Sequence, residues 1–342
     1  MQNQILKGAP LLNEEGMLIN SGWAKDLLLE YKRSSIKANR FRIKEWDYYC
    51  ILNHESKKGI ALTIADNSYM GLLSVSYLDL NNSMHITKTK IKAFTNGKYN
   101  MPNTSKSGNI SVRQGDLSIE FIKNGPNRML RVDFNNFSEN YRLNGELILY
   151  QPNDMDTMVI ATPFNEDKKA FYYNQKVNCM EASGELYFGN EKITFDRTNS
   201  FGVLDWGRGV WTYSNTWYWG SASGNVDNVP FGFNIGYGFG DTSKASENVV
   251  FYNNRAHKLT DVKFHIPSDD YLKPWKFTSS DNRFEMDFTP IIDRNSKTDV
   301  ILLKSIQHQI FGTFTGKVVL DNGKEVYIKN LLGFAEKVMN KW

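Results

Sequence analysis

The stretch from Leu204 to Gly220, LDWGRGVWTYSNTWYWG, holds four of the eight tryptophans in a chain of 342 residues. Asp205 and Arg208 flank the first of them, Trp206. Three kinds of structure produce such a segment: an active site, a platform on which a sugar stacks, and a densely packed seam. The surrounding sequence favours strands, in which residues two apart share one face.

The overall composition is that of a soluble globular protein rich in β structure. Hydrophobic residues make up 41% of the chain, charged residues 23% and aromatic residues 13%, and a high aromatic content favours sheet. The length predicts one large or two medium domains. A net charge of +4, from 41 basic and 37 acidic residues, and the lack of a clustered basic arm argue against nucleic acid as a partner.

Targeting and metal-binding signals are missing from the sequence. The first 17 residues lack a charged segment followed by a long apolar core, so we expect no signal peptide. No apolar run approaches the roughly 18 residues that a membrane helix needs. Cys50 and Cys179 are too far apart for a CxxC site, and we expect both as buried thiols in a reducing cytoplasm. Without HxH or HExxH motifs, we predict no metal and no other cofactor.

Strand and turn patterns dominate from Phe41 onward. Turn signals recur every 8–12 residues or so, as in an all-β sandwich or barrel. Gly184–Phe195 and Gly316–Ile328 read as hairpins with Gly-Asn or Asn-Gly at the bend, and 251–259 reads as a hairpin that turns at Asn253-Asn254. Helical signals are scarce, and only Trp23–Arg33 is consistent with a short helix.

The sequence contains an internal repeat. Ser183–Asp205 resembles Thr315–Glu336, because each runs from a small residue and Gly through a strand, a turn and a second strand to a carboxylate. Glu45–Gly71 resembles Thr216–Gly240 in the same order, with a Trp-led strand, a polar hairpin and an apolar strand. Two matches in a common order predict two similar β domains in tandem.

We place these domains at residues 1–205, with a short leader, and 206–342.

The central segment FYYNQKVNCMEASGELYFGNEKITFDRTNSFGVLDWGRG resembles the signature of the AttH and carotenoid-hydratase group. Nearly the whole chain resembles the uncharacterised bacterial family DUF2804, through RIKEWDYY, WGRGVW, GYGFG, SEN, HKL and a closing GFAE. The AttH-like group folds as two packed lipocalin-like (calycin) barrels, so the resemblance implies an all-β fold of two such domains with few short helices.

The resemblance implies a fold more than a reaction. The wider group includes isoprenoid hydratases, pericyclase-like cyclases and proteins of no assigned activity, and one fold hosts many chemistries. The corner LDWGRG lacks the histidine that hydratase members tend to carry beside the aspartate. This difference argues against hydratase chemistry.

The candidate binding residues lie in and after the tryptophan-rich stretch. In FGFNIGYGFG, residues 231–240, the odd positions are bulky and the even positions are Gly or Asn, so one strand face is almost bare. Either a ligand or the indoles of a neighbouring strand fit against such a face. We predict an aromatic-lined ligand site formed by Trp206, Arg208, Trp211, Trp217, Trp219, Asn234, Tyr237, Glu247 and Asn248.

We predict Asp205 and His257 as catalytic residues. An aspartate buried against indoles has a raised pKa and serves as a general acid, while aromatic faces stabilise the cation that protonation creates. Arg208 would bind a carboxylate or phosphate of the substrate. The alternatives are that Arg208 pairs with Asp205 or Glu247, and that His257 satisfies backbone groups. We expect Asp47, with charged neighbours, on an exposed edge face.

These observations favour a protein that binds a hydrophobic small molecule, such as an isoprenoid, a fatty acyl chain or a polyketide, in a β-barrel cavity. If it is an enzyme, the expected reaction is a metal-free, proton-assisted hydration, isomerisation or cyclisation. The alternatives are a carbohydrate-binding or carbohydrate-active protein that stacks sugars on tryptophan, and a non-catalytic structural or stress protein. We expect a cytoplasmic monomer or homodimer.

Overall fold

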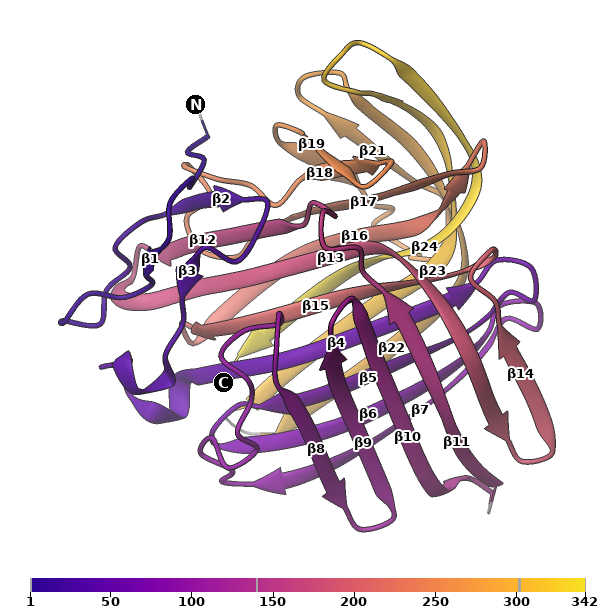
Figure 1. The fold of residues 1–342 in the computed structure, drawn as a ribbon, viewed down its shortest axis with the longest axis horizontal. Coiled ribbons are helices and arrows are strands. Elements are labelled where there is room, and N and C mark those ends of the chain that lie inside the picture. The colour runs from indigo at the N-terminus through magenta and orange to yellow at the C-terminus, as the bar shows by residue number, and fades with distance from the viewer. Residues whose placement is uncertain (1, 140, 301–302, 342) are drawn as a thin grey trace.

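The computed structural model describes residues 2–139, 141–300 and 303–341, which form two large antiparallel sheets (Figure 1). One sheet has thirteen strands and the other has nine. A two-stranded parallel pair, β1 Ala9–Pro10 with β3 Leu29–Glu30, and two 3₁₀ turns, η1 Arg33–Ser35 and η2 Arg40–Arg42, complete the regular structure. The prediction of an all-β fold with few short helices is confirmed.

The first sheet follows the spatial order β7-β6-β5-β4-β15-β13-β11-β10-β9-β8, and β2, β12 and β14 pair beside this path. Its strands are β2 Gly22–Ala24, β4 Ile43–Asn53, β5 Lys58–Asp66, β6 Met70–Asp79, β7 Met84–Ala93, β8 Asn109–Gln114, β9 Leu117–Asn124, β10 Asn127–Ser138, β11 Tyr141–Tyr150, β12 Met158–Phe164, β13 Asp167–Phe188, β14 Glu191–Phe195 and β15 Ser200–Val210.

The second sheet follows the order β19-β18-β17-β16-β24-β23-β22-β21-β20. Its strands are β16 Ser214–Val226, β17 Val229–Tyr237, β18 Val249–Tyr252, β19 Arg255–Lys258, β20 Val262–His265, β21 Trp275–Ser279, β22 Phe284–Val300, β23 Leu303–Val319 and β24 Glu325–Lys341. The three predicted hairpins are confirmed as β13–β14, β18–β19 and β23–β24. Asn253 and Asn254, at the bend of β18–β19, both have positive φ.

Each sheet curves around its own apolar core, and a third core lies between the two sheets. Strand alternation divides the residues among these cores. On β4, Tyr49 and Ile51 face the core of the first sheet, whereas Tyr48 and Cys50 face the second sheet. We call the faces turned toward each sheet's own core the inner faces, and we call the region between the sheets the seam.

The tryptophan-rich stretch is the joint at which the chain changes sheet. β15 ends at Val210 in the first sheet and β16 begins at Ser214 in the second. Along β15, Trp206 is on the inner face, so the alternate position Gly207 is on the seam face. A Cβ added at Gly207 would overlap the Trp46 ring. The glycine therefore leaves the space that this indole fills.

Pairing registers support the internal repeat. Asp205 lies opposite Tyr48 on one neighbouring strand and Lys176 on the other. Glu336 lies in the same way between Trp219 and Gln309. Because the sheet changes only after Val210, the domain boundary after residue 205 falls inside β15 and remains a prediction.

The longest strand, β13, connects the two sheets through a bulge. Its register with β15 shifts between Val177 and Met180, and Cys179 there has a φ of 60°. The Asn178 amide donates to Ser221 Oγ at 2.8 Å and to the Phe233 carbonyl at 3.0 Å, both in the second sheet. The bulge thus fixes the second sheet against the first.

The predicted helix at Trp23–Arg33 is wrong. This segment contains β2 and β3 and ends in a 3₁₀ turn. Trp23 pairs with Ile160 of β12, and Leu29 pairs with Ala9. Strand pairing with distant segments overrides the local helical preference.

We predict that Gly207→Ala destabilises the chain by about 1–3 kcal/mol, because the new methyl group forces the Trp46 ring out of a filled seam. Urea unfolding monitored by circular dichroism measures the change. Gly8→Ala is the matched control, since its Cβ would meet only the Leu28 carbonyl oxygen, at 3.5 Å. Equal stability of the two variants would contradict this account of the seam.

Candidate functional site

A cluster of three carboxylates surrounds one buried lysine in the seam. Lys176 Nζ lies 3.0 Å from Asp205 Oδ1 and 4.0 Å from Glu247 Oε2, and the Lys176 side chain is 2% exposed. Glu336 is the third carboxylate, and its charge couples to both Lys176 and Asp205. Strand pairing places Lys176 beside Asp205, while Glu336 comes from the second sheet and Glu247 from the residues just before β18.

Glu336 has the properties of a proton donor near neutral pH. Trp217 Nε1 donates to its Oε1 at 2.9 Å, and Gln309 Nε2 donates to its Oε2 at 3.0 Å. Burial raises the pKa of Glu336 to about 7; the Asp205 charge adds to this shift, and the Trp217 hydrogen bond and Lys176 oppose it. Glu336 is therefore protonated in a large fraction of molecules at pH 7.

Glu247 and Tyr172 have unused hydrogen-bonding capacity. Neither carboxylate oxygen of Glu247 forms a hydrogen bond with another described residue, and the Tyr172 hydroxyl forms none either. The Asn234 amide donates to the backbone carbonyl of Glu247 instead. Burial raises the pKa of Glu247 against the effect of Lys176, and burial followed by the nearby carboxylates raises the pKa of Tyr172. Buried polar atoms without partners are candidate ligand contacts.

Aromatic rings cover the cluster. The Trp211 ring centroid lies 5.3 Å from that of Trp46, 5.4 Å from that of Trp217 and 5.9 Å from that of Phe239. Tyr172 stacks on Phe239 at 4.3 Å. Trp46 and Trp217 are the members of this group that keep part of their surface in solvent. The aromatic wall therefore reaches from the buried acids to the surface.

This arrangement is suited to acid catalysis on an apolar molecule. A carboxylic acid with a raised pKa can protonate an alkene or a carbonyl, and indole faces stabilise the resulting cation. The Lys176 ammonium lies 3.8 Å from the ring centroid of Trp219, so one indole of the seam already contacts a cation. In the described chain, no group of three His, Cys, Asp or Glu side chains is arranged to hold a metal ion.

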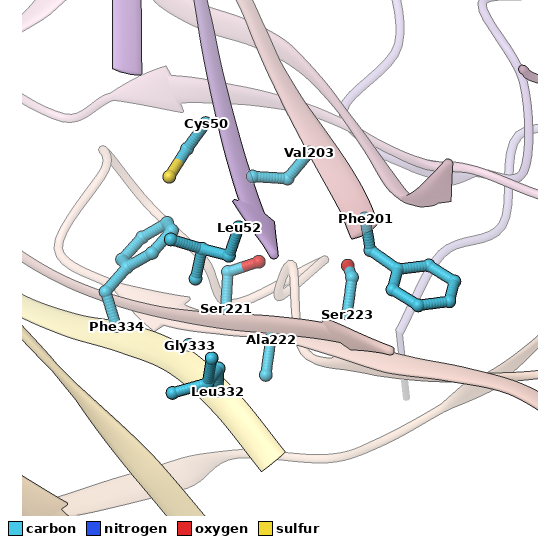
Figure 2. Close-up of a pocket in the computed structure, with 10 residues that line it drawn as sticks. All are labelled: Cys50, Leu52, Phe201, Val203, Ser221, Ala222, Ser223, Leu332, Gly333 and Phe334. Carbon is cyan, nitrogen blue, oxygen red and sulfur yellow. The ribbon is translucent and has the colours of Figure 1, made fainter. Parts of the chain in front are cut away.

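The seam is closely packed in this structure. Figure 2 shows residues that line a hollow on the seam, among them Cys50, Ser221 and Phe334. The volume of this hollow is about 10 Å³. That is room for about one water molecule. The bare glycine face of β17 is also filled, because the Glu247 carboxylate lies against Gly236 and the Cys179 sulfur against Gly232. A ligand at the acids would have to displace seam side chains.

Six of the predicted site residues come together in the seam. They are Asp205, Trp211, Trp217, Trp219, Asn234 and Glu247. Asn234 accepts a hydrogen bond from Trp219 Nε1 at 2.6 Å, so its amide holds an indole of the wall.

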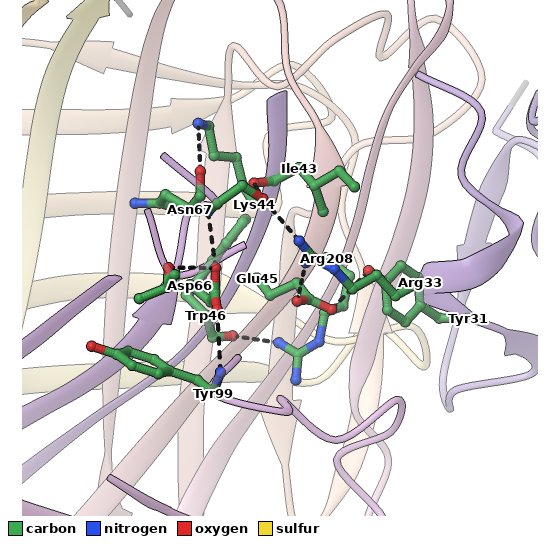
Figure 3. A network of polar contacts seen from close by, with 12 residues as sticks. Tyr31, Arg33, Ile43, Lys44, Glu45, Trp46, Asp66, Asn67, Tyr99 and Arg208 are labelled. Carbon is green, nitrogen blue, oxygen red and sulfur yellow. Dashed lines mark hydrogen bonds and ion pairs between the residues drawn. The ribbon is translucent and has the colours of Figure 1, made fainter. Parts of the chain in front are cut away.

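Trp206 and Arg208 face the inner side of the first sheet. Arg208 Nη1 lies 2.9 Å from Asp47 Oδ1, and its guanidinium lies 4.3 Å from the Trp206 ring centroid. The alternative of an ion pair between Arg208 and Asp205 or Glu247 is therefore wrong. Figure 3 shows Arg208 beside a second network, in which Glu45 accepts hydrogen bonds from Tyr31 and Arg33. Asp47, predicted to be exposed, is buried because it faces inward from a central strand.

The other predicted residues have contacts outside the cluster. His257, on the edge strand β19, accepts a hydrogen bond at Nδ1 from the Asp321 backbone N–H at 3.2 Å, so it satisfies a backbone group. The Asn248 side chain accepts from the Gly236 N–H at 2.7 Å and so shapes the turn before β18. Tyr237 stacks on Tyr218 at 4.6 Å on the inner face of the second sheet. Among the described residues, the two predicted as catalytic, Asp205 and His257, therefore share no interaction partner.

Sequence reasoning missed Lys176, Tyr172 and Glu336 as site residues. Alternation along β13 places Tyr172 and Lys176 on one face, but nearly every residue of this part of the strand is buried, so hydropathy does not distinguish its faces. Glu336 could have been found, because the internal repeat aligns it with Asp205.

A family model described as "Domain of unknown function (DUF2804)" matches residues 2–342, so the chain belongs to this family. No curated protein sequence matches the chain. Among the described residues, no helix is both long and apolar enough to cross a membrane.

Solved structures with low sequence identity share the fold over nearly their whole length. An AttH-type protein (NE1406) from Nitrosomonas europaea is 13% identical, with a TM-score of 0.53 over 96% of this chain and 98% of that one. CghA is 9% identical, with a TM-score of 0.59 over 98% and 97%. Kievitone hydratase from Nectria haematococca is 11% identical, with a TM-score of 0.50 over 98% of each chain. The AttH-like fold is thereby confirmed.

We predict that Glu336→Gln changes how stability depends on pH. The pKa of Glu336 is about 7 in the folded chain and ordinarily 4.5, so the folded chain binds this proton more tightly. Its stabilising contribution is present below pH 4.5 and is lost as the pH rises through about 7, which amounts to about 3 kcal/mol. The variant should gain this amount relative to the wild type between pH 4.5 and 8, as measured by urea unfolding.

Glu325→Gln provides the control on the same strand. Lys317 lowers the pKa of Glu325, which is exposed, so this variant should show no gain at high pH. Parallel pH profiles for the wild type and Glu336→Gln would contradict the raised pKa of Glu336.

Proposed function

We propose that this DUF2804 protein binds an apolar small molecule at the aromatic-lined seam and transfers a proton to it from the seam acids. The observation that carries the proposal is the group of three carboxylates around Lys176, beneath the Trp211 and Trp217 indoles. Groups whose pKa values are shifted by burial together with a charged partner are concentrated at functional sites. The ligand classes remain those expected from the sequence: isoprenoid, fatty acyl or polyketide-like molecules.

The seam residues divide the chemistry among them. Glu336 is the proton donor, because its pKa of about 7 keeps the proton available at neutral pH. Asp205, predicted from the sequence as the acid, also accepts from Asn174 Nδ2 at 2.5 Å and is the closest carboxylate to Lys176, so it compensates the ammonium charge. The Glu247 carboxylate and the Tyr172 hydroxyl, which lack hydrogen-bond partners in the described chain, orient a polar group of the ligand or a water molecule.

The proposed chemistry is an acid-assisted addition or rearrangement. Transfer of the Glu336 proton to a ligand double bond leaves a carbocation beside the indoles. Water can then add to the cation and return a proton to the carboxylate, or loss of a different proton gives an isomer or a ring. One structural neighbour is named as a hydratase, and hydration is the first of these outcomes.

The half-buried Trp217 is the route by which a ligand reaches the acids. Its indole caps Glu336 through a hydrogen bond and touches Trp211 and Phe239. Rotation of this one side chain uncovers the carboxylic acid without unpairing a strand.

The sugar-platform alternative has little support in the structure. A stacking platform would need the indole faces of Trp211, Trp217 and Trp219 open to solvent. Trp211 and Trp219 are only 7% and 4% exposed, and Trp217 is half-buried. The non-catalytic alternative makes the cluster a packing device and predicts that its residues affect stability and no ligand.

We predict that the full-length protein retains or binds an apolar ligand through Trp217. Organic extraction with mass spectrometry tests retention, and titration with farnesol and palmitate, followed by tryptophan fluorescence, tests binding. Trp217→Ala should weaken binding about tenfold or more through lost aromatic contact. Trp275→Phe is the control, since Trp275 lies on the inner face of the second sheet. Absence of binding to the wild type, or equal binding to Trp217→Ala, would rule against the proposal.

We also predict that Asp205→Ala and Glu336→Gln separate the structural role from the chemical one. Asp205→Ala leaves the buried Lys176 ammonium without its closest counter-charge and should cost about 3–5 kcal/mol in urea unfolding. Glu336→Gln keeps the side-chain shape, so it should bind farnesol but convert no ligand that the wild type converts. If Glu336→Gln converted such a ligand at the wild-type rate, Glu336 would not be the acid.

A further inference from the structure

A second polar site lies at one end of the inner face of the first sheet, separate from the seam. A hollow of about 420 Å³ opens there. Its lining includes Lys123 on β9 and Arg128 on β10, at positions where alternation would continue the apolar inner face of Phe121 and Leu130. Gln175 on β13 also lines it and is adjacent in sequence to Lys176 but on the opposite face. Cations and amides have replaced apolar residues at this end.

The carboxylates that line the hollow are all paired with other cations. Asp26 pairs with Lys106, Asp154 with Arg255 at 3.2 Å, and Asp156 with Lys25 at 2.8 Å; these ion pairs form the rim.

Lys123 and Arg128 are left without a carboxylate partner among the described residues. Lys123 Nζ donates to the Gly125 carbonyl at 2.6 Å. Arg128 is 3% exposed, yet its nearest partners are neutral: Gln151 Oε1 at 2.6 Å, the Ser105 carbonyl at 2.9 Å and the Tyr49 hydroxyl at 3.3 Å. Buried charges are ordinarily paired with a charge of opposite sign. The buried Arg128 guanidinium has no such counter-charge among the described residues.

Electrostatics at the hollow support the same conclusion. Burial, followed by the positive charge of Arg128, lowers the pKa of Lys123 to about 8. The Asp47 carboxylate couples electrostatically to Arg128, but it already pairs with Arg208 at 2.9 Å. An anion placed between Lys123 and Arg128 would offset the repulsion between these two cations and would give Arg128 a counter-charge of its own.

We infer that this hollow binds a small organic anion, held at its carboxylate or phosphate group by Lys123 and by the field of Arg128. Its volume lies within the range of about 300–1,000 Å³ that small-molecule sites occupy. The Gln151 oxygen receives both the Nε and an Nη of Arg128, which is the position that one oxygen of a carboxylate takes in a paired arginine. This site uses none of the seam residues, so it stands independently of the proposed function.

Calorimetric titration of the full-length protein tests the inference, with sodium octanoate and inorganic phosphate as probes at an ionic strength kept constant with chloride. The wild type should bind one equivalent, and Lys123→Met should weaken binding about tenfold or more by removing a charged donor. Lys123→Arg, which keeps the charge, should retain binding. Lys92→Met, at an exposed lysine on β7, is the matched control.

Acetylation read by peptide mass spectrometry locates the bound probe. Octanoate or phosphate should protect Lys123 from acetic anhydride and leave Lys92 unprotected. Stronger protection by octanoate assigns an organic carboxylate with an apolar chain, and protection by phosphate alone assigns a phosphate group. No binding of either probe, or equal binding by Lys123→Met, would overturn the inference.

Discussion

The buried ammonium of Lys176 is the interaction on which the seam depends. A charge that is 2% exposed needs counter-charges and hydrogen-bond partners within a few ångströms. Asp205 from the same sheet provides the first counter-charge, and Glu247, from the residues before β18, lies 4.0 Å away. Because the partners come from both sheets, the sheets cannot separate without exposing or stranding this charge. Burial in the seam raises the pKa values of Glu247 and Glu336; the Asp205 charge adds to both shifts and Lys176 opposes them.

The two halves of the chain meet at the seam in a reciprocal way. Tyr48 of the first half and Trp219 of the second occupy equivalent register positions opposite Asp205 and Glu336. Each reaches across to the other half: the Tyr48 hydroxyl donates to Gln309 at 3.3 Å, and the Trp219 ring lies under Lys176. An internal repeat has thus produced one shared interface in which Lys176 and Gln309 take equivalent places. The lysine exists in one copy only, and this asymmetry concentrates the charge chemistry around β13.

Much of the fold could be predicted from local signals, whereas the partners in the site could not. Gly-Asn and Asn-Asn turns set the hairpins, and the repeated order of strands indicated two similar halves. Asp205, Glu247 and the indoles were recognised by their residue types near one stretch. The partner of Arg208 is Asp47, 161 positions away, and only the pairing of β4 with β15 brings them together. The inner and seam faces of β13 cannot be told apart by hydropathy, because both are buried.

The distribution of polar residues also explains why the ligand sites are expected outside the two cores. Aromatic rings fill the inner face of the second sheet: the Phe233 ring centroid lies 5.0 Å from that of Phe284 and 4.9 Å from that of Phe314, so this core is closely packed. Ionisable groups instead gather in the seam, at the open end of the first sheet, and around the Arg208–Asp47 pair on the inner face of that sheet. The seam holds an excess of carboxylates and suits proton transfer, whereas the open end holds an excess of cations and suits an anion. β13 separates the two, with Lys176 facing one and Gln175 the other, so a substitution at either position can be made without removing a group from the other site.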